Sequence, residues 1–166
     1  MNTSPATPTP LHPMPENASG TLLVDLMATR DTVKELYRAT LARHDLTEQQ
    51  WRVLSALWAL HRLDATRLAE RAAVLPSSLT RIVSGLEARG YLNARRDPSD
   101  ARRTELRLSA DGRALMESLA PEIDRIEARI ASAVGAARLE ALLRALTQTR
   151  TALSDIAPER GLRPIG

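Results

Sequence analysis

The chain begins with a polar, proline-rich stretch and continues with long segments in which apolar residues recur at helical spacing. From Leu22 onward, apolar residues stand at positions 22/23, 26/27, 33, 36/37 and 40/41, which is the spacing of a helix with one buried stripe. Arg30 and His44 fall on the same side of this helix as the apolar residues. The pattern therefore predicts a helix with two polar side chains on its apolar face.

Two shorter helices are predicted next. Thr47 and Gln50 have the spacing of a capping box, in which the threonine hydroxyl accepts from the third helical amide and the glutamine reaches back to the cap. The helix that begins there includes Trp51. Asp64 has the short acceptor side chain of an N-cap residue, so another helix is expected over residues 65–73.

The following stretch, VLPSSLTRIVSGLEARG, predicts a helix with two different faces. Pro76 suits the first turn, where its missing N–H costs nothing, and Gly90 suits the left-handed residue just past the end. Spacing at i, i+3, i+4 and i+7 assigns the buried face to Leu79, Ile82, Val83 and Leu86. The opposite face consists of short polar side chains and one arginine, from Ser77, Ser78, Thr80, Arg81 and Ser84. Such a face indicates close approach to a partner, because a solvated helix usually mixes glutamate and lysine there.

After Gly90 the apolar period changes from 3.6 to 2. The segments YLNARRD and TELRLS alternate apolar and polar residues, as half-buried strands do. The segment PSDARR links them and is expected to form a turn, which begins at Asp97 and Pro98. The sequence therefore predicts a β-hairpin with a long tip that bears arginines.

The last part of the chain predicts two amphipathic helices, over about 110–134 and 136–156, with a break near Gly135. Ser109 can cap the first of them, and Pro121 is expected to kink it. Long amphipathic helices need a partner for their apolar stripes. The simplest partner is the first helix of the same chain together with the helices of a second copy, related by a twofold axis. Residues 20–46 and 110–157 are therefore expected to form the helical dimerisation region of a homodimer.

Both ends of the chain are expected to lie outside the folded part. Five of the ten prolines fall within the first 15 residues, among threonine, serine and asparagine. Such a segment cannot bury enough apolar surface to offset its ordering entropy. Residues 1–19 are therefore expected to form a disordered or extended arm, and residues 158–166 are expected to form a tail.

Composition excludes several classes of protein. The absence of cysteine rules out disulfides, thiolate zinc sites and a cysteine redox switch. The three histidines are scattered at positions 12, 44 and 61, and no nucleophile elbow, phosphate loop or HExxH motif occurs, so neither an enzyme, a metal site nor a cofactor is expected. A signal peptide and an apolar run of about 18 residues are also lacking, which predicts a cytoplasmic protein that does not enter the membrane.

The positive charge is concentrated in one region. The formal net charge is +3, and 22 of the 23 basic residues are arginine, with Lys34 the exception. Residues 76–107 hold seven arginines against four acids, so the whole formal excess lies in the two-faced helix and the hairpin. This region is therefore expected to bind an anionic partner.

The order of these elements is that of a winged helix-turn-helix within residues 47–109, in a fold that is mainly α with a small β-hairpin wing. One helix fits the major groove of DNA, and a hairpin can place arginine in the narrow minor groove. The expected contacts to double-stranded DNA are Ser77, Ser78, Thr80, Arg81 and Ser84 of the helix and Arg102 or Arg103 of the hairpin. Asp100 can hold one of these arginines by an ion pair. The alternative is a helical interaction module whose basic hairpin binds an acidic protein.

The stretches RHDLTEQQWRVL and LAERAAVLPSSLTRIVSGLEARGYLNARRDPSDARRTELRLSADGRAL resemble the MarR (multiple-antibiotic-resistance regulator) family, over roughly residues 22–155. RHDLTEQQWR is further similar to the subgroup that regulates homoprotocatechuate and related aromatic-acid catabolism. The resemblance implies a homodimer that binds a pseudo-palindromic operator, usually as a repressor, and that a small aromatic carboxylate releases. It also implies DNA contacts at Ser77, Ser78, Thr80, Arg81, Asp100, Arg102 and Arg103. A family member that regulates efflux or stress genes through another effector is the alternative.

The effector site that the resemblance implies lies between the dimerisation helices and the DNA-binding part. Arg30 is costly to bury unless a negative group meets it, and its fork matches a carboxylate. Tyr37, His44 and Trp51 are expected to pack around a phenolic ring or to form hydrogen bonds with it. Two alternatives stay open: Arg30 pairs with an acid across the dimer, or His44 ends its helix and interacts with the carbonyls there. Arg38 and His61 are weaker candidates.

Overall fold

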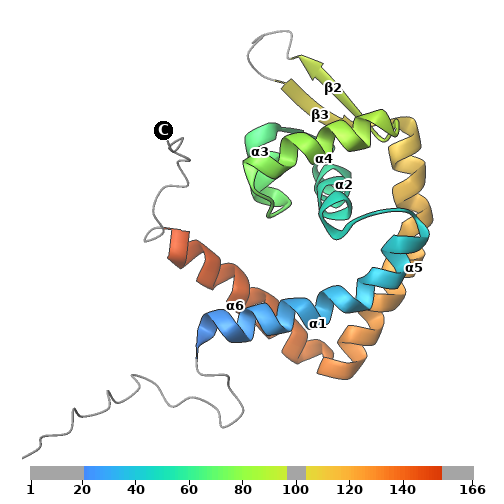
Figure 1. Ribbon diagram of the computed structural model, residues 1–166. Coiled ribbons are helices and arrows are strands. Elements are labelled where there is room, and N and C mark those ends of the chain that lie inside the picture. The colour runs from blue at the N-terminus through green and yellow to red at the C-terminus, as the bar shows by residue number, and fades with distance from the viewer. Residues whose placement is uncertain (1–20, 97–103, 155–166) are drawn as a thin grey trace, which may run out of the picture. The chain divides into compact units, whose positions relative to one another are not determined.

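The computed structural model describes residues 21–96 and 104–154 (Figure 1). Its elements are α1 (Leu22–Arg43), α2 (Glu48–Leu60), β1 (Arg62–Asp64), α3 (Ala65–Arg71), α4 (Pro76–Ala88), β2 (Leu92–Arg96), β3 (Thr104–Leu108), α5 (Ala110–Val134) and α6 (Ala136–Ser154). They divide into two compact units, with the boundary between Arg113 and Ala114. The expected fold, mainly α with a small β-hairpin wing, is confirmed. The predicted arm (1–19) and tail (158–166) lie outside the described residues.

Three helices begin where the sequence predicts, because a short polar side chain accepts a hydrogen bond from a free amide of the first turn. The Thr47 hydroxyl accepts from the Gln50 amide at 3.2 Å, and Gln50 Oε1 accepts from the Thr47 amide at 2.9 Å, which completes the capping box at α2. Asp64 Oδ1 accepts from the Arg67 amide at 2.8 Å at the start of α3. Ser109 Oγ accepts at 2.9 Å from the amide three residues further on, at the start of α5.

The predicted helix boundaries are confirmed as well. Pro76 occupies the first turn of α4, and Gly90 just after this helix has φ +76°. Gly135, with φ +89°, separates α5 from α6. Pro121 lies inside α5, which continues to Val134, so the proline does not divide this helix.

The core of the first unit is built around α2. This helix contacts α1, α3, α4 and the sheet (Figure 1), and its residues Val53, Leu54 and Leu57 are at most 1% exposed. Burial of a leucine side chain stabilises the fold by about 2 kcal/mol. Around α2 the core is completed by Leu79, Ile82, Val83 and Leu86 of α4, as predicted, and by Leu63, Leu92, Leu106 and Leu108 of the sheet.

The wing is a three-stranded antiparallel sheet with the order β1-β3-β2. Leu106 of β3 is paired with Leu63 of β1 on one side and with Ala94 of β2 on the other. The hairpin of β2 and β3 was predicted, whereas β1 was not, because a strand of three residues is too short to show a period of 2. The hairpin tip, residues 97–103, lies outside the described residues, and so do the predicted DNA contacts Asp100, Arg102 and Arg103.

In the single chain, the predicted buried stripe of α1 is buried only near the end of the helix. Tyr37, Thr40 and Leu41 are buried near its end, but the apolar residues before them are 38–69% exposed, namely Leu22, Leu23, Val24, Leu26, Met27, Val33 and Leu36. The physical reason is that, within the first unit, α1 packs against α2, and α2 follows directly on the end of α1. Arg30 is therefore not on a buried surface of the single chain.

A second apolar face is exposed on α6. Leu142, Leu143, Leu146 and Leu153 are 42–57% exposed in the single chain. In the part of the chain that the structure describes, none of the helices has an apolar stretch long enough to span a bilayer.

Candidate functional site

The exposed face of α4 consists of the side chains that the sequence assigns to it. Ser77, Thr80, Arg81 and Ser84 are exposed and Ser78 is half-buried. The four apolar side chains on the other face are buried in the core. A rigid helix therefore presents three short hydroxyl side chains and one guanidinium to solvent, which matches the close approach that reading of base edges needs.

Arg81 has the freedom that a contact with an external partner requires. Its side chain is exposed, and it has no ion-pair partner among the residues that the structure describes. Arg95 on β2 is also exposed. Other arginines of the first unit are occupied by contacts within the chain, as the next paragraphs describe. The unpaired cation of α4 thus lies on the face that the sequence predicts to bind DNA.

The end of α4 is joined to the wing. Glu87 Oε1 accepts a hydrogen bond from the amide of Ala94 in β2 at 3.1 Å. This bond directs the one acidic side chain of α4 toward the strand β2. It is one of the contacts between α4 and β2.

Arg89, the C-cap residue of α4, joins the same helix end to the connection between α1 and α2. Its Nη1 donates to the carbonyl of Asp45 at 2.7 Å, and its Nη2 donates to the carbonyl of His44 at 3.3 Å. The guanidinium carbon lies 4.9 Å from the ring centroid of Tyr91, within the range of a cation–π contact. Three groups thus fix this side chain.

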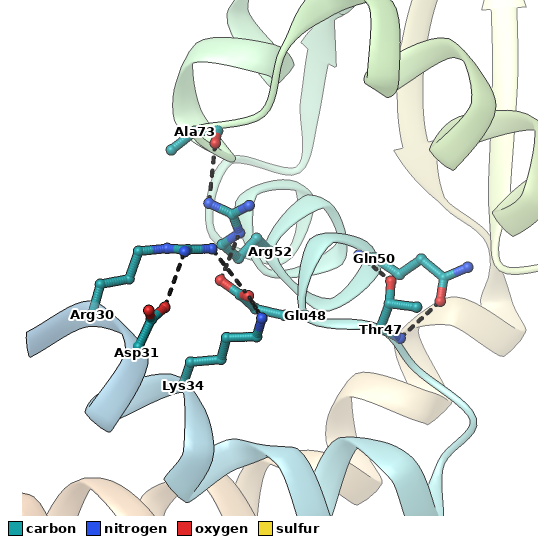
Figure 2. Close-up of polar contacts among 8 residues, drawn as sticks. All are labelled: Arg30, Asp31, Lys34, Thr47, Glu48, Gln50, Arg52 and Ala73. Carbon is teal, nitrogen blue, oxygen red and sulfur yellow. Dashed lines mark hydrogen bonds and ion pairs between the residues drawn. The ribbon is translucent and has the colours of Figure 1, made fainter. Parts of the chain in front are cut away.

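Cationic side chains from two helices meet at Glu48 on the first turn of α2 (Figure 2). Glu48 Oε2 is 3.4 Å from Arg30 Nη2 and 3.6 Å from Lys34 Nζ, both of α1. Its other oxygen, Oε1, is 3.6 Å from Arg52 Nε. Asp31 is the second partner of Arg30, at 3.3 Å. The group therefore has three cations against two carboxylates.

The burial of these side chains differs across the group. Arg30 and Lys34 are 45% and 48% exposed, whereas Glu48 is 19% exposed. Exposed ion pairs contribute only about 0–1 kcal/mol because water screens them. The cationic ends of these pairs, on Arg30 and Lys34, are thus accessible to an anion from solvent. In the single chain, Arg30 pairs with two acids of its own chain, Asp31 and Glu48.

Arg52 extends this group toward α4. Its Nη1 donates to the carbonyl of Ala73 at 3.0 Å, across the turn between α3 and α4 (Figure 2). Ala73 has φ +50°, in the left-handed region that alanine rarely adopts. Because the arginine holds this carbonyl, it helps to maintain a turn conformation that is locally unfavourable.

Of the side chains predicted to contact an aromatic effector, Tyr37 and Trp51 lie against each other. The rings of Tyr37 and Trp51 have centroids 5.0 Å apart and planes inclined by 30°, and Tyr37 is 9% exposed. His44 is the C-cap residue of α1, with its amide bonded to the carbonyls of Ala42 and Leu41. His44 thus ends its helix, as one of the two interpretations expected.

Sequence reasoning missed four residues of this region: Lys34, Glu48, Arg52 and Arg89. Glu48 and Arg52 stand at i and i+4 on a predicted helix, which is a signal for an ion pair. No local signal exists for the contacts to Ala73, His44 and Asp45, because their partners lie 21, 45 and 44 residues away in the chain.

Comparison with known proteins identifies the family. Residues 46–104 match the model of the MarR family. The chain is 30% identical to the HTH-type transcriptional regulator FarR of Neisseria gonorrhoeae, over 80% of this chain and 92% of FarR. It is 29% identical to the homoprotocatechuate degradative operon repressor of Escherichia coli, over 76% of this chain and 86% of the repressor. Among solved structures, it is similar to NadR in complex with 4-hydroxyphenylacetate, with a TM-score of 0.72 and 29% identity over 82% of this chain and 97% of NadR.

Proposed function

Because the chain belongs to the MarR family of transcriptional regulators, we propose that it is a sequence-specific DNA-binding repressor that a small aromatic carboxylate releases from its operator. The observation that supports the DNA-binding role most is the exposed face of α4, where Arg81 lies beside Ser77, Thr80 and Ser84 without a partner among the described residues. In this role α4 is the recognition helix. Arginine reads guanine through two parallel hydrogen bonds, and hydroxyl side chains contact base edges or phosphates.

The wing supplies the second set of proposed DNA contacts. Arg102 or Arg103 enters the minor groove, and Asp100 orients one of them through an ion pair. This proposal is supported by the position of the hairpin directly after α4 and by the hydrogen bond between Glu87 and Ala94. A wing attached in this way follows any movement of the recognition helix.

We also propose that the protein acts as a homodimer on a pseudo-palindromic operator. The support is the exposed apolar face of α6 and that of the first half of α1, which belong to the proposed dimerisation region, residues 20–46 and 110–157. Two recognition helices must enter successive major grooves about 34 Å apart. The dimer therefore sets the distance between the helices and with it the operator affinity.

The proposed effector site is the joint between α1 and α2, where Arg30, Tyr37, His44 and Trp51 lie. It is supported by the excess of cations around Glu48 and by the ring pair of Tyr37 and Trp51, which joins the same two helices. Two relatives have names that refer to aromatic acids, the homoprotocatechuate repressor and NadR with 4-hydroxyphenylacetate. In this arrangement, Arg30 binds the carboxylate and the aromatic side chains contact the ring. An effector lowers operator affinity only by as much as it prefers the conformation that does not bind DNA.

A binding experiment in two steps tests this function. First, the purified protein selects a duplex from a random library, and its dissociation constants for this duplex and a scrambled one are measured over a salt series. We expect a ratio of at least about 10³ and a steep fall of affinity with salt. Equal affinity for both duplexes would favour the interaction module that binds an acidic protein.

In the second step, the complex with the selected duplex is titrated with 4-hydroxyphenylacetate and, as a control, with the matching alcohol, which lacks the carboxylate. Release by the acid alone is the expected result. If the complex is specific but neither this acid nor benzoate, cinnamate or 6-hydroxynicotinate releases it, the protein is a regulator with another effector, as expected for efflux or stress genes.

A further inference from the structure

The recognition helix α4 is tied to the same region of the first unit at both ends, each time by an arginine that binds backbone carbonyls. Arg89 ties its C-terminal end to the α1–α2 connection, and Arg52 of α2 ties the turn before its N-terminal end. We propose that Arg52 and Arg89 are positioning residues for operator recognition, which set the placement of α4 and do not themselves contact DNA. This inference rests on the proposed function in DNA binding.

The contacts of Arg89 leave it little capacity for a phosphate. Both terminal nitrogens donate to carbonyls, at 2.7 Å and 3.3 Å, and the planar group lies against the ring of Tyr91. An arginine that binds phosphate needs the same fork for the phosphate oxygens. The sequence counts Arg89 among the seven arginines of the basic region, but its fork is used within the protein.

Arg52 is occupied in a similar way. Its side chain is 24% exposed, with Nε facing the Glu48 carboxylate at 3.6 Å and Nη1 bonded to Ala73. Nε is buried and lacks a closer hydrogen-bond partner in the described part of the chain, so loss of the carboxylate would leave it without compensation. Arg52 therefore stays in its place as long as Glu48 is present.

Arg52 and Arg89 connect α4 to different parts of the first unit, and this gives the two arginines different roles. Arg89 holds α4 to the end of α1 directly. Arg52 holds it through Glu48, whose other oxygen faces Arg30 and Lys34 of α1. A change at the ion pairs of α1 thus reaches the turn before α4 through a single carboxylate, without passing through the apolar core.

The test uses Arg89→Met and Arg52→Met in the full chain, with Arg38→Met as the matched control. Arg38 lies on α1 and pairs with Glu35 of its own helix at 2.6 Å, so the control removes the same charge without freeing α4. The readouts are the dissociation constants for the duplex that the wild type selects and for a scrambled duplex, each over a salt series, together with the melting temperature.

We expect each positioning variant to lower the ratio of the two dissociation constants about tenfold, the effect of losing one or two hydrogen bonds. The scrambled-duplex affinity and the salt slope should match those of Arg38→Met, because the number of neutralised phosphates is unchanged. Arg89→Lys and Arg52→Lys keep one donor and should restore part of the ratio.

Other outcomes overturn the inference. A salt slope that falls by about 1 for each arginine removed would show a direct phosphate contact. An unchanged ratio in both methionine variants, or a lower melting temperature without loss of the ratio, would reduce the two arginines to stabilising residues. If one methionine variant does not fold, the other methionine variant and the two lysine variants still test whether these arginines position α4. A wild type that prefers no duplex would contradict the proposed function instead.

Discussion

The ring of Tyr37 in α1 lies against the ring of Trp51 in α2, with centroids 5.0 Å apart and planes inclined by 30°. An offset aromatic pair of this kind contributes about 1 kcal/mol beyond the burial of its surface. The ion pairs of Glu48 with Arg30 and Lys34 join the same two helices. Apolar and ionic contacts thus hold α1 to α2 side by side.

Trp51→Ala should therefore lower the free energy of unfolding by about 3 kcal/mol, because a large, partly buried ring and its aromatic contact are removed together. Thermal or urea unfolding measures the change. Trp58→Ala is the matched control, since Trp58 lies on the same helix but is 39% exposed, and it should cost less than about 1 kcal/mol. Equal losses in the two variants would mean that the ring pair contributes nothing specific.

Gly112 at the start of α5 is predicted to be intolerant of any side chain. A Cβ at this position would lie 2.1 Å from the carbonyl oxygen of Tyr91, which is fixed by a hydrogen bond from the Ser109 amide at 3.0 Å. Gly112→Ala must displace backbone, so we expect a loss of at least about 2 kcal/mol in unfolding free energy. In the control Gly85→Ala the nearest atom is Nε2 of Gln50 at 4.0 Å, and removal of a helix-internal glycine should instead stabilise by up to about 1 kcal/mol.

The correctly predicted features depend on residues that are close in the sequence. The capping box of Thr47 and Gln50, the Pro76 start and the two faces of α4 all follow from spacings of a few residues. Their physics is local, since a cap or an amphipathic face needs only one helix to form. The exposed site residues Ser77, Thr80 and Arg81 were predictable for the same reason.

The features that the sequence did not show depend on partners distant in the chain. β1 exists because Leu63 is paired with Leu106 of the wing, and three residues have no periodicity that shows this. Arg30 was expected on a buried stripe, but burial is set by what packs on a helix, and within the first unit α1 packs on α2 near its end. Hydrophobic spacing identifies the apolar face of a helix but not its partner.

Arg81 and Arg102 are expected to affect DNA binding differently. Arg81→Ala should relax discrimination at particular base pairs of the selected duplex by about 1–3 kcal/mol, because a base-edge contact is lost. Arg102→Ala should weaken binding to all duplexes more uniformly, because the minor groove attracts arginine mainly by its potential. Measurement of both variants on a panel of single-base substitutions separates the two effects. Full affinity in both variants would remove the DNA-binding assignment.

Arg30→Met should abolish the response to an aromatic acid while the protein still binds its operator. Of the cations of α1 at Glu48, Arg30 is the one with the planar fork that matches a carboxylate, and its side chain is 45% exposed and accessible from solvent. Calorimetric titration with 4-hydroxyphenylacetate should show at least about tenfold weaker binding, and the control Arg71→Met, at an exposed arginine of α3, should bind as the wild type does. An unchanged dissociation constant for Arg30→Met would refute this role.

The exposed stripe of α6 gives a test of the dimer that is independent of DNA sequence. Leu143 is 57% exposed in the single chain, so a glutamate there is harmless to a monomer. In a dimer that buries this stripe, Leu143→Glu places an unpaired charge in an apolar contact, which costs several kcal/mol per copy. Gln148→Glu adds the same charge about 140° away around the helix and is the control.

Sedimentation at micromolar concentration should find the wild type and Gln148→Glu at twice the chain mass of 18.2 kDa, and Leu143→Glu at the mass of one chain. Operator affinity should fall with dimerisation, because a monomer engages one half-site and loses the second major-groove contact. A Leu143→Glu variant that remains dimeric would exclude the α6 stripe from the interface. The apolar face of α1 would then be the remaining candidate, and Leu26→Glu, at a residue that is 41% exposed, is the variant that tests it.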